Sequence, residues 1–227
     1  MVQVYIVVEG ETELEFVKSL LNPEFFSSQN AYGNPVRLGL TGGRCGGVSF
    51  KRVREHLQSL TAQHKRKGVA ITTMIDLYGR DGAWPREEEA NAKVDPYHRV
   101  QVLEEGMTQS IQATNFIPYL QLHEFEALLL AEPTKLLDYY PHRESDIEKL
   151  VSLVQQKGNC ELINSTPNGA PSKRIQEVIP EYNKVVGGNS TALNIGLKTL
   201  RERCRHFREW LEKLEAAIRA EDERLSP

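Results

Sequence analysis

Residues 2–8 form a nearly continuous apolar run, VQVYIVV, which is followed at once by Glu9 and Gly10. Such a run, rich in β-branched residues, is typical of a strand that is covered on both faces in a parallel sheet. Beyond Gly10, apolar residues return at helical spacing from Leu14 to Leu21, which predicts a strand, a tight turn and a helix. This pattern predicts a fold in which a buried strand ends at the edge of a sheet with the carboxylate of Glu9 directly after it.

Further strands and helices alternate along the first part of the chain. Apolar runs at residues 36–40, 69–75 and 116–122 predict three more strands, and amphipathic patterns between them predict helices. This alternation predicts an α/β fold with an open parallel four-stranded sheet flanked by helices. Such sheets carry their chemistry at the carboxyl ends of the strands, where Asp76 and residues 123–126 (HEFE) fall.

The rest of the chain has a helical pattern, which predicts two parts: residues 1–135 as the sheet-containing domain and residues 136–227 as a helical extension packed on it. Near the C-terminus, apolar residues step by alternating four and three positions: Leu193, Leu197, Leu200, Cys204, Phe207, Leu211, Leu214 and Ile218. We expect this stripe to be the buried side of a long helix. An exposed stripe would instead be a surface for a homodimer or another partner.

Composition narrows the classes of protein that fit. The chain has 227 residues, 40% of them hydrophobic, and a formal charge of −3, so any contact with nucleic acid needs local clusters of Lys and Arg. Its three cysteines lie far apart, without the spacing of a zinc site or a disulfide framework, which favours a reducing cytoplasm. No stretch approaches the roughly 18 apolar residues that cross a bilayer, so we expect no contact with a membrane.

Carboxylates cluster where the first strand meets the first helix, since Glu9 is followed by Glu11 and Glu13. With Asp76 and the glutamates of residues 123–126, they offer the oxygen ligands that hard cations such as Mg²⁺ or Mn²⁺ prefer. Two such ions stabilise both the attacking and the leaving oxygen when a phosphodiester is cleaved. Taken alone, three acidic residues at this place are more often a solvated helix N-terminus, where negative charge suits the helix dipole.

Two features together resemble the TOPRIM superfamily of topoisomerases, primases and nucleases. One is the apolar strand that ends in Glu9-Gly10-x-x-Glu13, and the other is the later apolar strand that ends in Asp76. The resemblance covers the part of the chain that contains the predicted strands. It implies that Glu9 and an acidic residue after the third strand bind metal and act on phosphodiester bonds.

A closer similarity extends over nearly the whole chain. Five segments are similar to the TOPRIM-related domain of unknown function 4276 family: VEGETE at 8–13, IDLYG at 75–79, HEFEALL at 123–129, APSKRI at 170–175 and CRHF at 204–207. Members of that family, as the resemblance implies, often lie beside an ATPase of the ABC or AAA type in phage-defence loci. It therefore implies a defence nuclease that works with an ATPase partner.

The chain departs from the superfamily pattern after the third strand, where Asp76-Leu77-Tyr78 replaces the usual Asp-x-Asp. One metal ligand is missing, so either a single metal ion suffices or Glu124 and Glu126 supply the missing oxygens. We favour the second, because both glutamates follow the fourth strand closely. Spacing alone leaves open which of the two faces inward and which caps the helix. For His123, a ligand or proton-transfer role and a backbone-bonded position at a helix start are equally good interpretations.

Local basic residues provide candidate contacts to nucleic acid. Lys173 and Arg174 open a short helix, so two cations and backbone N–H groups meet there, and Lys184 is assigned to the same surface. Arg44 lies in a glycine-rich segment before a helix, as in phosphate-binding loops. A solvated helix surface explains Lys173 and Arg174 equally well, and a tight strand-to-helix connection is the simpler interpretation for Arg44.

These patterns lead to one hypothesis and one alternative. The hypothesis is a Mg²⁺- or Mn²⁺-dependent nuclease acting on DNA or RNA, with an ATPase as its partner. Its predicted metal ligands are Glu9, Glu13, Asp76, Glu124 and Glu126, and the catalytic set comprises Glu9, Asp76, Glu124, Glu126 and Lys173. The alternative is a non-catalytic interaction module that binds or regulates an ATPase, which Tyr78 in place of the second aspartate favours.

Overall fold

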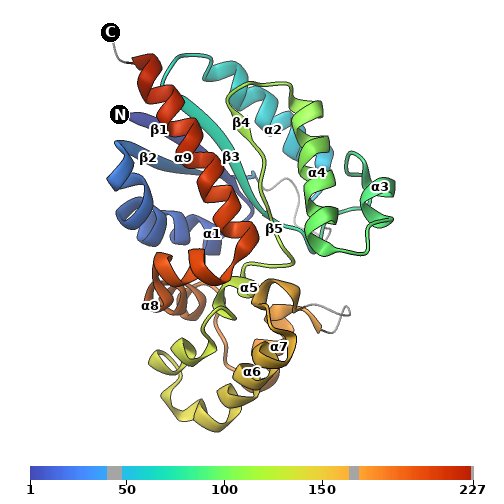
Figure 1. The fold of residues 1–227 in the computed structure, drawn as a ribbon, viewed down its shortest axis with the longest axis vertical. Coiled ribbons are helices and arrows are strands. Elements are labelled where there is room, and N and C mark those ends of the chain that lie inside the picture. The colour runs from blue at the N-terminus through green and yellow to red at the C-terminus, as the bar shows by residue number, and fades with distance from the viewer. Residues whose placement is uncertain (40–47, 164–168, 226–227) are drawn as a thin grey trace.

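A parallel sheet surrounded by helices forms the centre of the computed structural model, which describes residues 1–39, 48–163 and 169–225 (Figure 1). The strands are β1 Val2–Val8, β2 Ala31–Arg37, β3 Val69–Asp76, β4 Phe116–Ile117 and β5 Leu120–Gln121. They pair in the order β2-β1-β3-β4, β5 adds a second short pairing to β3, and every pair is parallel. The predicted α/β fold is therefore confirmed.

Helices connect the strands and make up most of the C-terminal half. They are α1 Glu11–Phe16, α2 Phe50–Gln63, α3 Glu87–Asn91, α4 Pro96–Ile111, α5 Glu126–Leu129, α6 Glu144–Lys157, α7 Pro171–Val178, α8 Val186–Arg203 and α9 Arg205–Leu225. Short 3₁₀ turns and a π-helical stretch, Val17–Phe26 after α1, complete the connections. In the described part of the chain, no helix is both long and apolar enough to cross a lipid bilayer.

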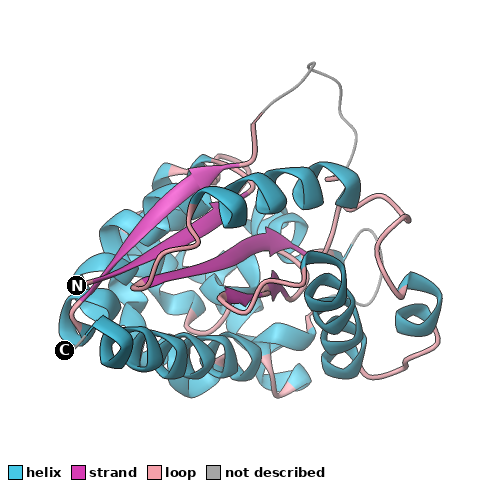
Figure 2. Cartoon of the chain, turned by 90° about the horizontal axis from the view of Figure 1, so that it is seen from above, coloured by secondary structure: helices cyan, strands magenta, loops and turns pink. Residues whose placement is uncertain are grey.

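Helices cover both faces of the sheet (Figure 2). On one face, Ile71 and Ile75 of β3 pack with the apolar sides of α2 and α4. On the other, Val4 and Ile6 of β1 and Met74 of β3 pack with α1, α8 and α9. Every residue of β3 is buried, which explains why the sequence of this strand does not alternate between apolar and exposed polar residues.

The strand predicted at residues 116–122 is divided into β4 and β5, so the prediction of one strand is wrong. Pro118 lies at the division and has no N–H to donate to a neighbouring strand. The hydroxyl of Thr73 replaces the missing backbone hydrogen bonds between the strands, since it accepts from Tyr119 N at 2.9 Å and donates to Tyr119 O at 2.7 Å. The chain after β5 thereby still ends beside the carboxyl end of β3.

The second strand also differs from the prediction, since β2 spans Ala31–Arg37 and not residues 36–40. Gly33 and Pro35 are uncommon inside a strand, but β2 lies at the edge of the sheet, where a proline is tolerated. The side chain of Asn22 fastens the edge by accepting from Gly33 N at 2.8 Å and donating to Gly33 O at 3.0 Å.

The C-terminal apolar stripe is buried within this chain, as expected, except for Leu193, which is 40% exposed, and two helices carry the stripe instead of one. Helix α8 is kinked at Gly196, and the backbone leaves the helical region at Cys204 before α9 begins. Leu200, Phe207 and Leu211 are fully buried in the core that includes β1. This surface is therefore not exposed for a homodimer, and the boundary predicted after residue 135 stays a prediction.

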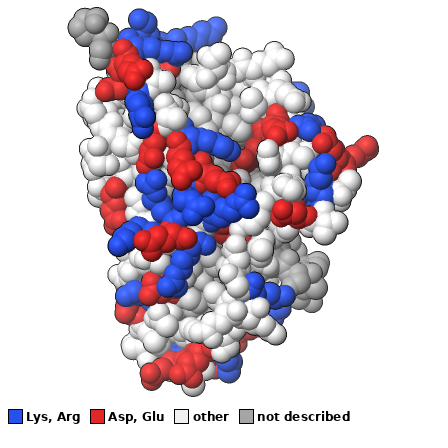
Figure 3. Space-filling view, in the orientation of Figure 1, with Lys and Arg blue, Asp and Glu red and all other residues white. Residues whose placement is uncertain are grey.

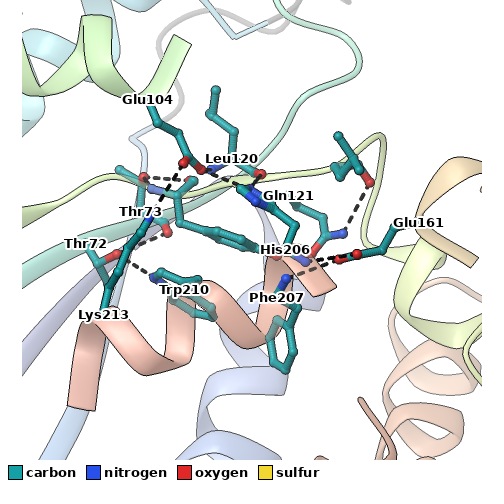
Figure 4. A network of polar contacts seen from close by, with 12 residues as sticks. Thr72, Thr73, Glu104, Leu120, Gln121, Glu161, His206, Phe207, Trp210 and Lys213 are labelled. Carbon is teal, nitrogen blue, oxygen red and sulfur yellow. Dashed lines mark hydrogen bonds and ion pairs between the residues drawn. The ribbon is translucent and has the colours of Figure 1, made fainter. Parts of the chain in front are cut away.

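A buried polar network joins α9 to the sheet and to the rest of the chain (Figure 4). Glu161 accepts hydrogen bonds from the backbone N–H groups of His206, at 3.0 Å, and Phe207, at 3.1 Å, and so satisfies the first turn of α9. The His206 Nε2 atom lies 3.0 Å from Glu104 Oε1, and the same oxygen accepts from Leu120 N at 2.9 Å. One carboxylate thus holds both β5 and the start of α9.

This network predicts a pH-dependent stability. Burial lowers the pKa of His206, but the carboxylate of Glu104 outweighs burial, so the pKa is raised above 6.5. The protonated imidazole therefore stabilises the fold fully below pH 6.5, and this contribution is lost as the pH rises through the raised pKa. We predict that His206→Asn lowers the free energy of unfolding by about 1–3 kcal/mol at low pH, and that the difference from wild type narrows at alkaline pH.

Urea unfolding of both proteins between about pH 6 and pH 9 measures that difference. Because all other titrating groups are shared, their contributions cancel in the comparison. A difference that stays constant over this range would contradict the assignment of a protonated His206.

Candidate functional site

Acidic residues follow three strands whose carboxyl ends meet at one edge of the sheet. Glu9 comes directly after β1, Asp76 is the last residue of β3, and Glu126 begins α5 shortly after β5. Asp76 is paired in register with Gln121 of β5, so the third and fourth predicted strands end side by side. The structure therefore brings the sequence-predicted carboxylates of three strand ends into one region.

Asp76 is held firmly and is only 8% exposed. Its Oδ1 atom accepts a hydrogen bond from Phe125 N at 3.0 Å, which ties the end of β3 to the start of α5. Burial raises the pKa of Asp76 well above its usual value, Lys184 opposes this, and the neighbouring carboxylates of Glu13, Glu9 and Glu126 raise it further. Ionisation of the carboxyl groups at this edge is therefore energetically unfavourable.

Lys184 supplies positive charge to this edge from the connection between α7 and α8. Its Nζ atom lies 3.3 Å from Glu126 Oε2 and 3.7 Å from Asp76 Oδ2. Burial lowers the pKa of Lys184, but the surrounding carboxylates, Asp76 first, outweigh it and raise the pKa. The sequence assigned Lys184 to a nucleic-acid surface, whereas the structure places it directly among the candidate metal ligands.

Glu126 is the inward-facing glutamate of the HEFE segment, since it is fully buried. Burial raises its pKa, and Lys184 counteracts that shift. The hydroxyl of Tyr182 donates to Glu126 Oε1 at 3.4 Å, a contact that sequence analysis missed. Gly188 of α8 makes room for this tyrosine, because a Cβ atom at that position would lie 2.8 Å from the hydroxyl of Tyr182.

Glu9 and Glu13 lie together at the turn between β1 and α1. Glu13 is buried and accepts a hydrogen bond from Gly10 N at 2.9 Å, so it folds back on the turn instead of pointing to solvent. Burial, reinforced by the charge of Glu13, raises the pKa of Glu9 to about 7. The Glu9 Oε2 atom is buried and, among the described residues, has no hydrogen-bond partner. Glu9 and Glu13 are therefore not the solvated carboxylates of a helix N-terminus.

Glu124 does not face inward, and the helix that it caps is α7 and not, as expected, the helix that follows it in sequence. Its Oε2 atom accepts a hydrogen bond from Ser172 N at 3.0 Å, so the carboxylate caps the first turn of α7. Its charge still reaches the site, since it contributes to raising the pKa of both Glu9 and Glu126. Glu124 therefore positions α7 beside the acidic edge.

His123 occupies a strained backbone position between β5 and α5. Its φ of 66° lies in the left-handed region, which side chains other than glycine seldom adopt. Its carbonyl accepts from Tyr78 N at 2.8 Å, and burial lowers the pKa of its imidazole to about 4. The segments after β3 and β5 are thus joined through the backbone, which helps to keep Asp76 and Glu126 together.

The other predicted basic residues lie outside the carboxylate cluster or outside the described part of the chain. Lys173 is exposed in the first turn of α7, and Arg174 pairs with Glu177 at 3.2 Å. Arg44 falls among residues 40–47, which are outside the described residues. Within the described part of the chain, Lys184 is the predicted basic residue that contacts the acidic edge.

The donor chemistry of this edge fits a hard divalent cation. Its side chains offer carboxylate oxygens, and the buried Glu9 Oε2 lacks a donor among the described residues. In the same residues, however, no three His, Cys, Asp or Glu side chains are already arranged to hold a metal ion. The ammonium of Lys184 balances the charge in this arrangement, so binding of an ion requires the lysine and carboxylates to move apart.

The fold and the edge define an α/β protein with a buried acidic site that contains one lysine. Residues 8–215 match the family described as "Domain of unknown function (DUF4276)", and the chain belongs to that family. This confirms the predicted similarity to the domain of unknown function 4276 family, and the matched range contains Glu9, Asp76, Glu126 and Lys184. No curated protein and no solved structure gives a significant match.

The contact between Lys184 and the carboxylates predicts an effect on stability. Lys184→Met leaves Asp76 and Glu126 without their ion pair, and because water screens the partly exposed lysine, we expect a loss of about 1–2 kcal/mol. Urea unfolding in metal-free buffer measures this loss. Lys198→Met, which changes an exposed lysine of α8, is the matched control and should stay within about 0.5 kcal/mol of wild type. Equal stability of the two variants would show that the ion pair contributes nothing.

Proposed function

We propose that the protein is a Mg²⁺- or Mn²⁺-dependent nuclease that hydrolyses phosphodiester bonds in DNA or RNA. The observation that carries the proposal is the convergence of carboxylates from three strand ends around Lys184. Oxygen ligands suit the metals that accompany phosphodiester cleavage, and a lysine beside them suits the phosphate. Few purely structural roles require so many ionisable groups to be buried at one place.

The roles of the residues follow from their positions. Glu9, Glu13, Asp76 and Glu126 would hold the metal, because their oxygens face the same buried edge. The metal would supply Lewis-acid stabilisation of phosphate charge and lower the pKa of a bound water. Glu124 keeps its hydrogen bond to α7 and adds negative charge.

Basic side chains act on the phosphate in this proposal. Lys184 has a flexible stem and is partly exposed, so its ammonium can turn from Asp76 to a phosphate oxygen that arrives with the substrate. There it stabilises the negative charge that develops during cleavage. Lys173 and Arg174 lie in the first turn of α7, which Glu124 ties to the site, and they bind the flanking phosphates.

The finer family relationship is part of the proposal. A parallel sheet of order β2-β1-β3-β4, with Glu9 after β1 and Asp76 at the end of β3, supports membership of the TOPRIM superfamily. From the same resemblance we propose that the protein is a cytoplasmic effector of phage defence that works with an ATPase of the ABC or AAA type.

A second candidate function is a non-catalytic module that binds or regulates an ATPase. Tyr78 favours it, because this residue stands where the superfamily has a second aspartate and its side chain is 38% exposed. Lys184 also balances the acidic edge without a metal. A site that no longer binds metal, but whose residues are still needed for folding, would have these two properties.

Cleavage assays test the nuclease. Asp76→Asn and Glu9→Gln each remove one metal ligand with little change in shape, and we predict that each slows Mn²⁺-dependent cleavage of DNA or RNA at least about a hundredfold. Glu15→Gln on α1 removes an exposed carboxylate that pairs with Lys18 and should cleave like wild type. Folded Asp76→Asn and Glu9→Gln proteins that cut as fast as wild type would remove this mechanism.

Metal titration separates the two functions independently of any substrate. Isothermal titration with Mn²⁺ should give saturable binding to wild type that weakens at least about tenfold in Asp76→Asn, because a ligand is lost. The non-catalytic module predicts no saturable binding that depends on Asp76. Glu15→Gln again serves as the control that keeps wild-type affinity.

A further inference from the structure

Helix α2 and the loop that follows it carry an unusual concentration of positive charge. Residues 50–68 contain six Lys or Arg residues and a single acidic residue, Glu55, although the whole chain has a formal charge of −3. The residues Phe50, Val53, Leu57 and Leu60 bury one side of α2 against the sheet. The cations project from the remaining surface and are Lys51, Arg52, Arg54, Lys65, Arg66 and Lys67.

Most of these cations are unpaired. Lys51, Arg54 and residues 65–67 are exposed, and none of their side chains forms an ion pair or hydrogen bond with any residue that the structure describes. From Lys51 to its end at Gln63, α2 extends about 18 Å, and residues 65–67 follow directly. We call Lys51, Arg54, Lys65, Arg66 and Lys67 the basic track.

The far end of the basic track opens into a cleft of about 480 Å³. Its walls contain both polar and apolar side chains and come from α2, residues 65–67, the connection from Gln112 to Asn115, and Arg224 at the end of α9. Glu221 anchors the loop by accepting from Gly68 N at 2.9 Å and pairing with Arg224 at 2.5 Å. Lys and Arg atoms gather at this end of the molecule, near the C-terminus (Figure 3).

The near end of the track lies beside the acidic edge. Val48, two residues before α2, donates from its backbone N to Gly79 O at 3.1 Å, and Gly79 follows Asp76 closely. Strand β3 runs between the same two places, since Val69 lines the cleft and Asp76 lies at the site. The eight residues of β3 place these ends about 23 Å apart.

We propose that the basic track and its cleft bind the sugar–phosphate backbone of the nucleic acid substrate, away from the bond that is cut. A polyanion is repelled by the carboxylates of the acidic edge and by the net charge of the chain, so a nuclease of this kind needs a separate cationic surface. The track is linear, polar and long enough for several successive phosphates, which suits a nucleic acid backbone. This assignment rests on the proposed nuclease function and extends it.

Binding measured without metal tests the track separately from cleavage. Fluorescein-labelled duplexes of DNA and RNA are titrated with full-length protein in EDTA, and fluorescence anisotropy is followed at several salt concentrations. We expect Lys65→Glu/Arg66→Glu/Lys67→Glu to weaken binding to at least one duplex more than tenfold and to reduce the salt slope by about two to three, as the loss of three phosphate contacts requires. A second variant, Lys51→Gln/Arg54→Gln, is expected to weaken it several-fold.

The matched control reverses three exposed lysines elsewhere, Lys149→Glu/Lys157→Glu/Lys198→Glu, and should bind like the wild type. Equal affinity of the Lys65–Lys67 variant and this control overturns the proposal. Poly-glutamate that displaces the duplexes at matched charge concentration also overturns it, by showing a surface for acidic protein. Wild-type protein that binds the duplexes through the basic track but shows no cleavage with Mg²⁺ or Mn²⁺ would reject the nuclease and leave the track.

Discussion

The ion pairs of Lys184 with Asp76 and Glu126 are the interaction on which this structure depends. Folding removes both carboxylates almost completely from water, beside Glu13, which is also buried. Such a cluster is destabilising unless a cation lies within it, because burial and mutual repulsion both oppose ionisation. The C-terminal part of the chain supplies that cation and adds Tyr182 against Glu126, so the site and the packing of the helices on the sheet form together.

The proposed nuclease would need this arrangement, because a chain with a net negative charge has to act on a polyanion. Carboxylate oxygens of the acidic edge would hold a divalent ion in place of the ammonium of Lys184, and the lysine would then be free to contact the substrate. The positive charge proposed to hold nucleic acid lies elsewhere, along α2, where the described carboxylates form no ion pair with the basic track.

The sequence predicted what depends on local pattern. Buried apolar strands placed Glu9 and Asp76 at one edge, since strand ends follow from hydrophobic runs alone. It did not show that Thr73 would replace the ladder at Pro118, or that Glu124 would cap α7 while Glu126 turned inward, because each depends on a distant segment. The contact of Lys184 was missed for the same reason. The basic residues of the track are visible in the sequence, but only the structure shows that their side chains lack ion-pair partners among the described residues and that residues 65–67 line a cleft.

Crystals soaked in MnCl₂ and measured at the manganese absorption edge test the central claim most directly. The account predicts anomalous density for at least one ion bound jointly by Glu9 and Asp76, with the ammonium of Lys184 moved away from Asp76. A fully soaked crystal with no manganese at this edge, and with Lys184 still paired to Asp76 and Glu126, would contradict it.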